Sequence, residues 1–311
     1  MKFKKLDNWF TRVLLIGLMA LVYIGGYCEK PRPTNPNLRF LVGDTLNHTI
    51  HCSNPIVSPE GNTIYYLRAN SDSARFDELT FGSIYSINAD GTDNKEVSHG
   101  KYKALAISPD GKKLAAHSLT VTGSPPHLQP ESLIVIFDLS TEKCDTYPAA
   151  GHWIWDIEFS KNNTIVYYSI EIQGYPSTMK IYSLNLLDST NTLIVSLNRL
   201  VGFDVFTNDS LFIDSNTTFP QINPVYEKYV IGTSGFESLV LTLQNIDTHK
   251  LDTLPDSLIP YNGNVGYPYW FPNGKNIAFM AKPYNEPAGE IAGEIWILTD
   301  FFDQVDTTGL K

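Results

Sequence analysis

Basic clusters and cysteines are both scarce in this chain of 311 residues. The formal net charge is −10, and no run of lysines or arginines occurs in the body of the chain. Such a surface repels phosphate groups, so nucleic acid is not expected as a partner. Three cysteines are present, Cys28, Cys52 and Cys144. The last two stand far apart with no cysteine framework around them, so we predict independent thiols, with one disulfide as the alternative.

A hydrophobic run long enough for a spanning helix is also missing. The apolar stretch from Val13 to Tyr27 has 15 residues, whereas a bilayer core needs roughly 20. Four basic residues precede it: Lys2, Lys4, Lys5 and Arg12. This layout predicts a secretory signal peptide over residues 1–27, with an uncleaved N-terminal anchor as the alternative. We therefore expect an exported protein.

The segment after the apolar stretch begins with Cys28, and residues 28–37 are rich in proline and asparagine, which predicts a tether. The arrangement resembles the leader of a bacterial lipoprotein, although Tyr27 stands where such leaders carry a small residue. A lipid chain on Cys28 would anchor the protein without a spanning helix. The expected location is the periplasm or the outer-membrane-associated cell envelope.

Aromatic and turn-forming residues are abundant where charge is not. The chain has 17 Tyr, 16 Phe and 5 Trp, together with 21 Gly and 19 Pro, against 18% charged residues. Aromatic residues favour strands, and glycine and proline favour tight turns. The composition therefore predicts an all-β protein.

Four related strings recur along the chain: VSPEGNTIYYL from Val57, ISPDGKKLAAH from Ile107, FSKNNTIVYYS from Phe159 and WFPNGKNIAFM from Trp270. In each, an apolar residue leads into a short polar turn and a β-rich run, which is typical of a hairpin. Alternating apolar runs such as SLIVIFDLSTE follow most copies and predict further strands. Each repeat should therefore supply four strands.

The spacing of the repeats predicts a β-propeller over residues 38–311. Weaker copies begin at Phe206 and Ile222, so the successive spacings are 50, 52, 47, 16 and 48 residues. Propeller blades of four strands repeat at about 40–50 residues. We predict six blades, with an incomplete one near residues 200–215, and five blades as the alternative. Residues between Leu38 and Cys52 are predicted to add a strand that closes the ring.

The strings SPDGKKLA, SPEGNTIYYL, FPNGKNIAF and IYSINADGT resemble the repeats of the TolB-like β-propeller family, also described as WD-like periplasmic repeats. The resemblance covers about residues 53–300 and is weakest around residues 200–235. It implies a cell-envelope propeller, often six-bladed and preceded by a signal or lipoprotein leader. It also implies protein interaction more often than catalysis.

Motifs for catalysis are missing. GTSGF from Gly232 comes nearest to a nucleophile elbow, but it lacks the final glycine. His48 and His51, next to Cys52, are weak candidates for metal ligands, because zinc would need further ligands from elsewhere. We therefore expect no catalytic residue, metal or cofactor.

Two carboxylates are candidates for a binding site in the central channel. Asp156 and Glu158 stand two apart just before Phe159, so they share one face of a strand, predicted to be the innermost of its blade. Solvated channel carboxylates are the simpler interpretation, and a charged binding site is the functional one.

Aromatic residues begin the corresponding strands of two repeats: Trp153, Trp155, Tyr267 and Tyr269. Exposed at a channel mouth, they would form a stacking surface for a sugar or peptide, whereas buried they would pack between blades. Trp153 and Tyr267 are the better surface candidates, and Trp270 is expected to be buried.

The expected function is that of a non-catalytic propeller, a scaffold that binds a protein or peptide partner and is attached to a membrane by a lipid or an N-terminal anchor. The alternative is a carbohydrate-binding or carbohydrate-active propeller, a lyase or hydrolase, with its site at the channel mouth.

Overall fold

The computed structural model describes residues 35–43, 50–70, 81–122, 129–172, 178–199, 202–214, 217–234, 240–255, 258–260, 265–281, 293–305 and 307–310. Contacts divide the chain into Met1–Thr34 and Asn35–Lys311, and the described residues all belong to the second unit. The predicted signal peptide, the lipidation of Cys28 and the candidate ligand His48 lie outside the described residues. Within the described part of the chain, no helix is long and apolar enough to cross a membrane.

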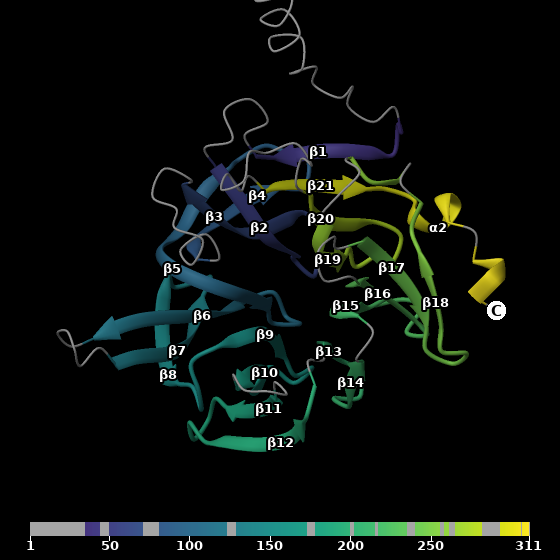
Figure 1. The fold of residues 1–311 in the computed structure, drawn as a ribbon. Helices are drawn as coiled ribbons and strands as arrows, with labels where there is room; N and C mark the ends of the chain where they lie inside the picture. The colour runs from purple at the N-terminus through teal and green to yellow at the C-terminus, as the bar shows by residue number, and fades with distance from the viewer. Residues whose placement is uncertain are drawn as a thin grey trace, which may run out of the picture. The chain divides into compact units, whose positions relative to one another are not determined.

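The described strands of Asn35–Lys311 pair antiparallel in five sheets (Figure 1). The largest sheet has seven strands in chain order: β2 (Ile50–Val57), β3 (Thr63–Asn70), β4 (Gly82–Asn88), β5 (Lys95–Ile107), β6 (Lys113–Thr122), β7 (Gln129–Asp138) and β8 (Lys143–Pro148). The next has four: β9 (Ile154–Phe159), β10 (Ile165–Ile172), β11 (Thr178–Asn185) and β12 (Asn191–Leu197).

The remaining sheets follow along the chain. A two-stranded sheet consists of β13 (Gly202–Val205) and β14 (Leu211–Asp214), and a four-stranded sheet of β15 (Thr218–Ile222), β16 (Tyr229–Ser234), β17 (Val240–Asn245) and β18 (Lys250–Thr253). The last sheet joins β19 (Val265–Trp270), β20 (Ile277–Ala281) and β21 (Glu294–Leu298) to β1 (Leu38–Val42). Two short helical turns, α2 (Phe301–Gln304) and η3 (Thr308–Leu310), come after β21.

The repeated strings form hairpins, as predicted. In the second copy, Ser108 donates its backbone N–H to the Lys113 carbonyl at 2.9 Å and its hydroxyl to Asp110 Oδ1 at 2.7 Å. Gly111 has a φ of 70°, a conformation that glycine adopts without steric cost. In the third copy Asn163 replaces that glycine, with a φ of 61°. Asparagine adopts positive φ more readily than most residues, so the turn keeps the same conformation.

The seven-stranded sheet contains two repeats that share one long strand. The first part of β5 pairs with β4, as in Ser86↔Lys95, and its last part pairs with β6, as in Ile107↔Leu114. β5 therefore ends one four-stranded unit and begins the next.

The first strands of the repeats contact one another in a closed order. β2 contacts β5, β5 contacts β9, β9 contacts β13, β13 contacts β15, β15 contacts β19, and β19 contacts β2. Sheets arranged around a common centre in this way form a β-propeller (Figure 1). The predicted fold class is confirmed.

The predicted ring closure is confirmed as well. β1 pairs antiparallel with β21, with Leu38 opposite Leu298 and Phe40 opposite Trp296. A strand from near the start of the described chain thus becomes the outer strand of the last sheet. This pairing covers an edge of β21 that would otherwise stay open.

The hairpin β13–β14 lies where the repeat spacing falls to 16 residues. β13 contacts both β9 and β15, so it occupies a place of its own among the inner strands. Because a two-stranded sheet can be counted as a blade or as an insertion, the number of six blades stays a prediction.

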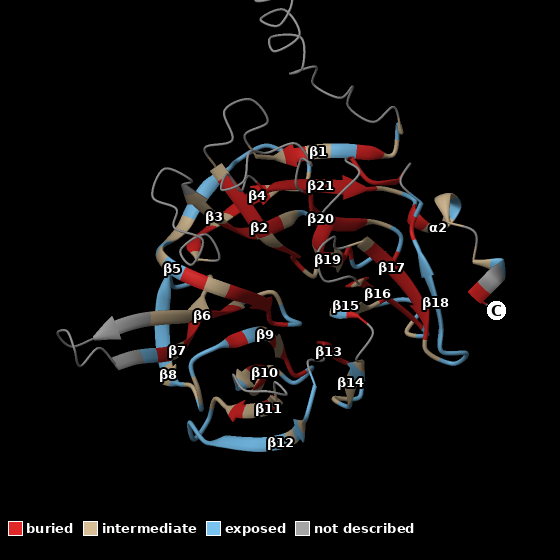
Figure 2. Cartoon of the chain, in the orientation of Figure 1, coloured by how far each residue is buried: buried red, intermediate tan, exposed pale blue. Residues whose placement is uncertain are grey.

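Side chains between adjacent sheets form the core. Figure 2 shows the inner strands largely buried and the outer strands β8, β12 and β18 largely exposed. The cluster around β13 is small, with Tyr167, Ile181, Phe203 and Val205 as its buried members. A two-stranded sheet covers less of its neighbours than a four-stranded one.

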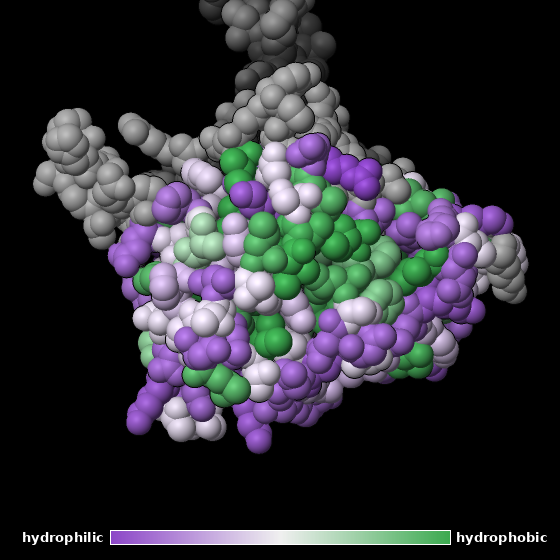
Figure 3. All heavy atoms as spheres, turned by 90° about the horizontal axis from the view of Figure 1, so that it is seen from below, coloured by the Kyte–Doolittle hydropathy of each residue, from purple (hydrophilic) through white to green (hydrophobic). Residues whose placement is uncertain are grey.

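Exposed apolar side chains lie on β14 of the β13–β14 hairpin and on β12. Leu193 and Ile194 on β12 are 48% and 47% exposed, and Ile213 on β14 is 37% exposed. Figure 3 shows apolar surface gathered on the face that is seen from below the view of Figure 1. β12 and β14 lie toward that side in Figure 1.

Candidate functional site

Three carboxylates from two neighbouring inner strands meet in the channel. β9 presents Asp156 and Glu158 on one face, and β13 contributes Asp204. Asp204 accepts backbone hydrogen bonds from Val205 at 2.6 Å and from Ile222 at 2.5 Å. Hydrogen bonds from two strands therefore fix the Asp204 side chain beside β9.

Glu158 and Asp156 each accept fewer hydrogen bonds than Asp204 does. Glu158 Oε1 accepts a hydrogen bond from Gln221 Nε2 at 2.9 Å. Asp156 Oδ1 accepts one from the Ile157 N–H at 3.0 Å, but its buried Oδ2 has no hydrogen-bond partner. A buried carboxylate oxygen without a partner is costly while the group is charged.

Burial and mutual repulsion favour the protonated forms of these carboxyls. Burial, followed by the charge of Asp204, raises the pKa of Asp156 to about 8. Burial also raises the pKa of Asp204 to about 6, although its backbone hydrogen bonds and Lys161 oppose this. For Glu158, burial and then the charges of Asp204 and Asp156 raise the pKa well above its ordinary value. The cluster therefore holds protons near neutral pH.

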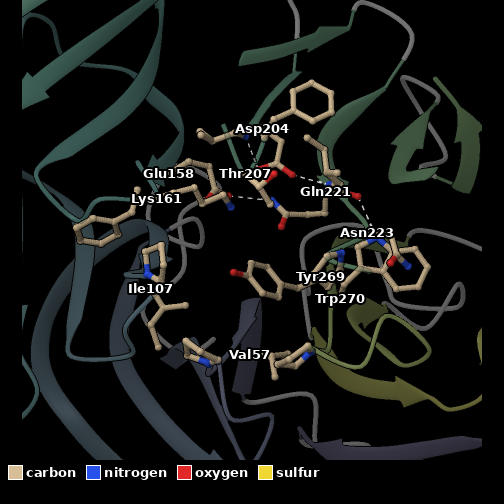
Figure 4. A pocket seen from close by; sticks show the side chains of 18 of the residues that line it. Val57, Ile107, Glu158, Lys161, Asp204, Thr207, Gln221, Asn223, Tyr269 and Trp270 are labelled. Carbon is tan, nitrogen blue, oxygen red and sulfur yellow. Dashed lines mark hydrogen bonds between the residues drawn. The ribbon is translucent and has the colours of Figure 1, made fainter. Parts of the chain in front are cut away.

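A cavity of about 240 Å³ opens on this cluster. Glu158, Asp204 and Gln221 line one side, with Lys161 near its edge (Figure 4). The Tyr269 ring projects into the middle of the cavity, and its hydroxyl has no hydrogen-bond partner within the described chain. Burial and the neighbouring carboxylates raise the pKa of Tyr269 well above its ordinary value.

Kinks in three inner strands shape this channel. Asn54, Phe219 and Tyr267 each precede a proline and have φ values of 50°, 51° and 51°. The pairing register of β2, β15 and β19 shifts at these points. Proline has no N–H for the ladder, so a bulge forms at each site. The bulge in β19 precedes Tyr269 and sets the direction of its ring.

The residues around the cavity share one position in the repeat. The backbone N–H groups of Ser160, Phe206, Asn223 and Phe271 each begin the turn of their hairpin. Two residues before them stand Glu158, Asp204, Gln221 and Tyr269, respectively. The corresponding residues of the first two repeats are Ile56 and Ala106. One side of this layer is therefore polar and the other apolar.

Asp204 and Gln221 are site residues that the sequence patterns did not indicate. They belong to the degenerate repeats, whose turns lack the Ser-Pro pattern. Counting two residues back from each turn would have found both of them.

The predicted aromatic residues fall in different places. Trp153 directly precedes β9, Trp155 is its second residue, and the two are 42% and 38% exposed, whereas Trp270 is buried as expected. Tyr267 is half-buried and packs on Phe219, with ring centroids 4.2 Å apart. Tyr269 lines the cavity, so the structure brings it together with Glu158 but not with the two tryptophans.

The histidine and cysteine candidates lie apart from the carboxylate cluster. His51 is buried on β2, and among the described residues no group of three His, Cys, Asp or Glu side chains is placed to hold a metal ion. Cys52 is a buried free thiol and Cys144 an exposed one. The prediction of two independent thiols is confirmed.

Comparisons with known proteins show likeness of fold. No family model and no curated protein match this sequence. TolB from Acinetobacter baumannii is 15% identical with a TM-score of 0.40, over 78% of this chain and 54% of that one. The β-propeller domain of the Trilobed protease from Pyrococcus furiosus is 12% identical with a TM-score of 0.45, over 85% and 100%. Oligogalacturonate lyase in complex with manganese is 13% identical with a TM-score of 0.35, over 80% and 68%. TolB is thus among the solved structures to which the chain is similar, and the β-propeller fold itself is shown by the closed order of the inner strands.

Proposed function

We propose that this propeller binds a protein or peptide partner without catalysing a reaction, and that the Tyr269 cavity receives a cationic group of that partner. The group would be a lysine or arginine side chain or a free amino terminus. The observation that carries the proposal is the excess of buried carboxylates over cations at one cavity.

The charges around the cavity favour a cation over an anion. Glu158 and Asp204 line it, the charge of Asp156 contributes to the raised pKa of Glu158, and Lys161 is a nearby positive charge. A bound ammonium or guanidinium group would replace the protons of these carboxyls with hydrogen bonds to the charged forms.

The neutral side chains suit the same ligand. The unpartnered hydroxyl of Tyr269 can accept a hydrogen bond, and aromatic faces attract cations. Trp270 donates its indole N–H to the Gln221 carbonyl at 2.9 Å, which fixes the wall behind Gln221. The site is thus rigid on one side, which reduces the entropy lost on binding.

The test uses three short peptides: acetyl-Gly-Lys-Gly-amide, acetyl-Gly-Arg-Gly-amide and acetyl-Gly-norleucine-Gly-amide. NMR titration of the whole protein at pH 8 should show that a basic peptide binds and that the norleucine peptide binds at least about tenfold more weakly, because it lacks the charge. Binding should weaken as the pH falls from 8 to 5, because protonation of the carboxyls competes with the cation while lysine stays charged.

Glu158→Gln is the informative variant, because glutamine keeps an oxygen for the hydrogen bond from Gln221 and removes the charge. We expect it to weaken binding of the basic peptide by about tenfold. Asp247→Asn, at an exposed turn, should leave binding unchanged. Equal binding of the basic and norleucine peptides, or no effect of Glu158→Gln, would contradict the proposal.

A further inference from the structure

We infer a second binding site, independent of the Tyr269 cavity, in which a sugar ring stacks on Trp153 and its hydroxyls bond to Glu171 and Lys180. The site lies at the start of β9, whereas Glu158 lies near its end. A strand rises about 3.3 Å per residue, so the two sites belong to opposite ends of the inner strand.

A separate cavity of about 250 Å³ marks the site. Trp153, Glu171 and Lys180 line it, together with the apolar side chains of Ile170 and Ile172. The cavity therefore combines a flat aromatic wall, an apolar floor and two oppositely charged groups.

The exposure of Trp153 needs an explanation beyond packing. Tryptophan is usually well buried, yet this ring is 42% exposed and borders a cavity. Lys103 Nζ lies 5.7 Å from the centre of the Trp153 ring and 4.8 Å from that of Trp155. Cation–π contacts of this kind hold the rings in place without covering them.

Trp155 positions the acidic group of the site. Its indole N–H donates to Glu171 Oε2 at 2.9 Å, and the Glu171 backbone N–H donates to the Trp153 carbonyl at 3.0 Å. One carboxylate oxygen is thereby fixed, and no hydrogen bond is present at Oε1 in the described structure. Glu171 can therefore accept hydrogen bonds from a ligand without first being ordered.

Lys180 supplies a donor from the neighbouring strand. It stands opposite Ile170 in the pairing of β10 with β11, one residue along from the partner of Glu171. Both Glu171 and Lys180 line the cavity, so it has an acceptor and a donor.

A saccharide matches this combination better than an apolar ligand does. A pyranose ring has a flat face of C–H groups, which packs on an indole, and a rim of hydroxyls, each both donor and acceptor. A purely apolar ligand would leave Glu171 and Lys180 desolvated without partners, which is costly. The volume suits a single sugar ring or the end of a chain, since it is below the roughly 300–1,000 Å³ of drug-sized sites.

Saturation-transfer NMR on the whole protein with glucose, N-acetylglucosamine and galacturonate tests the inference. At least one sugar should show saturation transfer from the aromatic protons, strongest at the C–H groups of one ring face. Trp153→Ala should weaken its binding by at least about tenfold. Trp155→Phe keeps a ring but loses the hydrogen bond to Glu171, and it should weaken binding by a few fold.

Controls separate this site from the Tyr269 cavity and from misfolding. Tyr226→Ala removes another exposed aromatic side chain, 43% exposed, and should leave sugar binding unchanged. Glu158→Gln should also leave it unchanged, so either proposal can fail without the other. Glu171→Gln, which keeps the shape of the side chain, provides a second variant should Trp153→Ala not fold. Absence of saturation transfer with all three sugars overturns the inference, as does sugar binding that survives both Trp153→Ala and Glu171→Gln.

Discussion

Replacing Leu41 with aspartate should lower the free energy of unfolding by about 3 to 5 kcal/mol, the usual cost of an unpaired buried charge. Leu41 lies on β1, is 8% exposed, and packs in a cluster that includes Ile64 and Ile297. The charge would separate β1 from β21 and open the ring at its closure. Chemical denaturation followed by tryptophan fluorescence measures the loss.

The same substitution at an exposed leucine is the matched control. Leu187 is 81% exposed, so Leu187→Asp should change the free energy of unfolding by less than about 0.5 kcal/mol. If Leu41→Asp lowers the free energy of unfolding as little as Leu187→Asp does, the pairing of β1 with β21 contributes little to stability.

Replacing Asp156 with asparagine should stabilise the protein at pH 8 and have little effect near pH 4. The folded-state pKa of Asp156 is about 8, above the ordinary value of 3.8, so the folded protein keeps a proton that the unfolded chain releases. Stability of the wild type should therefore fall as the pH rises from about 4 to 8. Asparagine removes this dependence, because it carries no charge at either pH.

The gain at pH 8 should be on the order of 2 kcal/mol, since one pKa unit corresponds to about 1.4 kcal/mol and the three carboxyls share the repulsion. Thermal melts at both pH values would show this as an increase of about 4 to 8 °C in Tm at pH 8. Asp145→Asn, at an exposed carboxylate, should leave Tm unchanged at both values. A stabilisation of the same size at pH 4 would rule out relief of charge as the cause.

Local signals identified the hairpins and the order of the strands. The Ser-Pro-Asp-Gly turn at Ser108 has a hydroxyl cap and a glycine at positive φ, and both are visible in the string itself. From Asp156 to Phe159 the burial of β9 alternates with a period of two, and the same spacing puts Asp156 and Glu158 on one face of the strand. Such features depend on neighbouring residues, so a sequence can specify them.

The partners of these residues depend on contacts between distant segments. Asp204 reaches Glu158 because β13 contacts β9, and Tyr269 reaches both because the ring closes from β19 to β2. Trp153 is exposed, and its link through Lys103 and Trp155 to Glu171 joins three different strands.

The sequence by itself therefore determined the all-β class, the repeats, the closing strand and the candidate residues on β9, since periodicity and turn chemistry are local. Only the tertiary structure decided that Glu158 and Asp204 line one cavity with Tyr269 and that the two tryptophans lie outside it. The physical reason is that burial and charge coupling arise between side chains far apart in the chain, which become neighbours when the ring of inner strands closes.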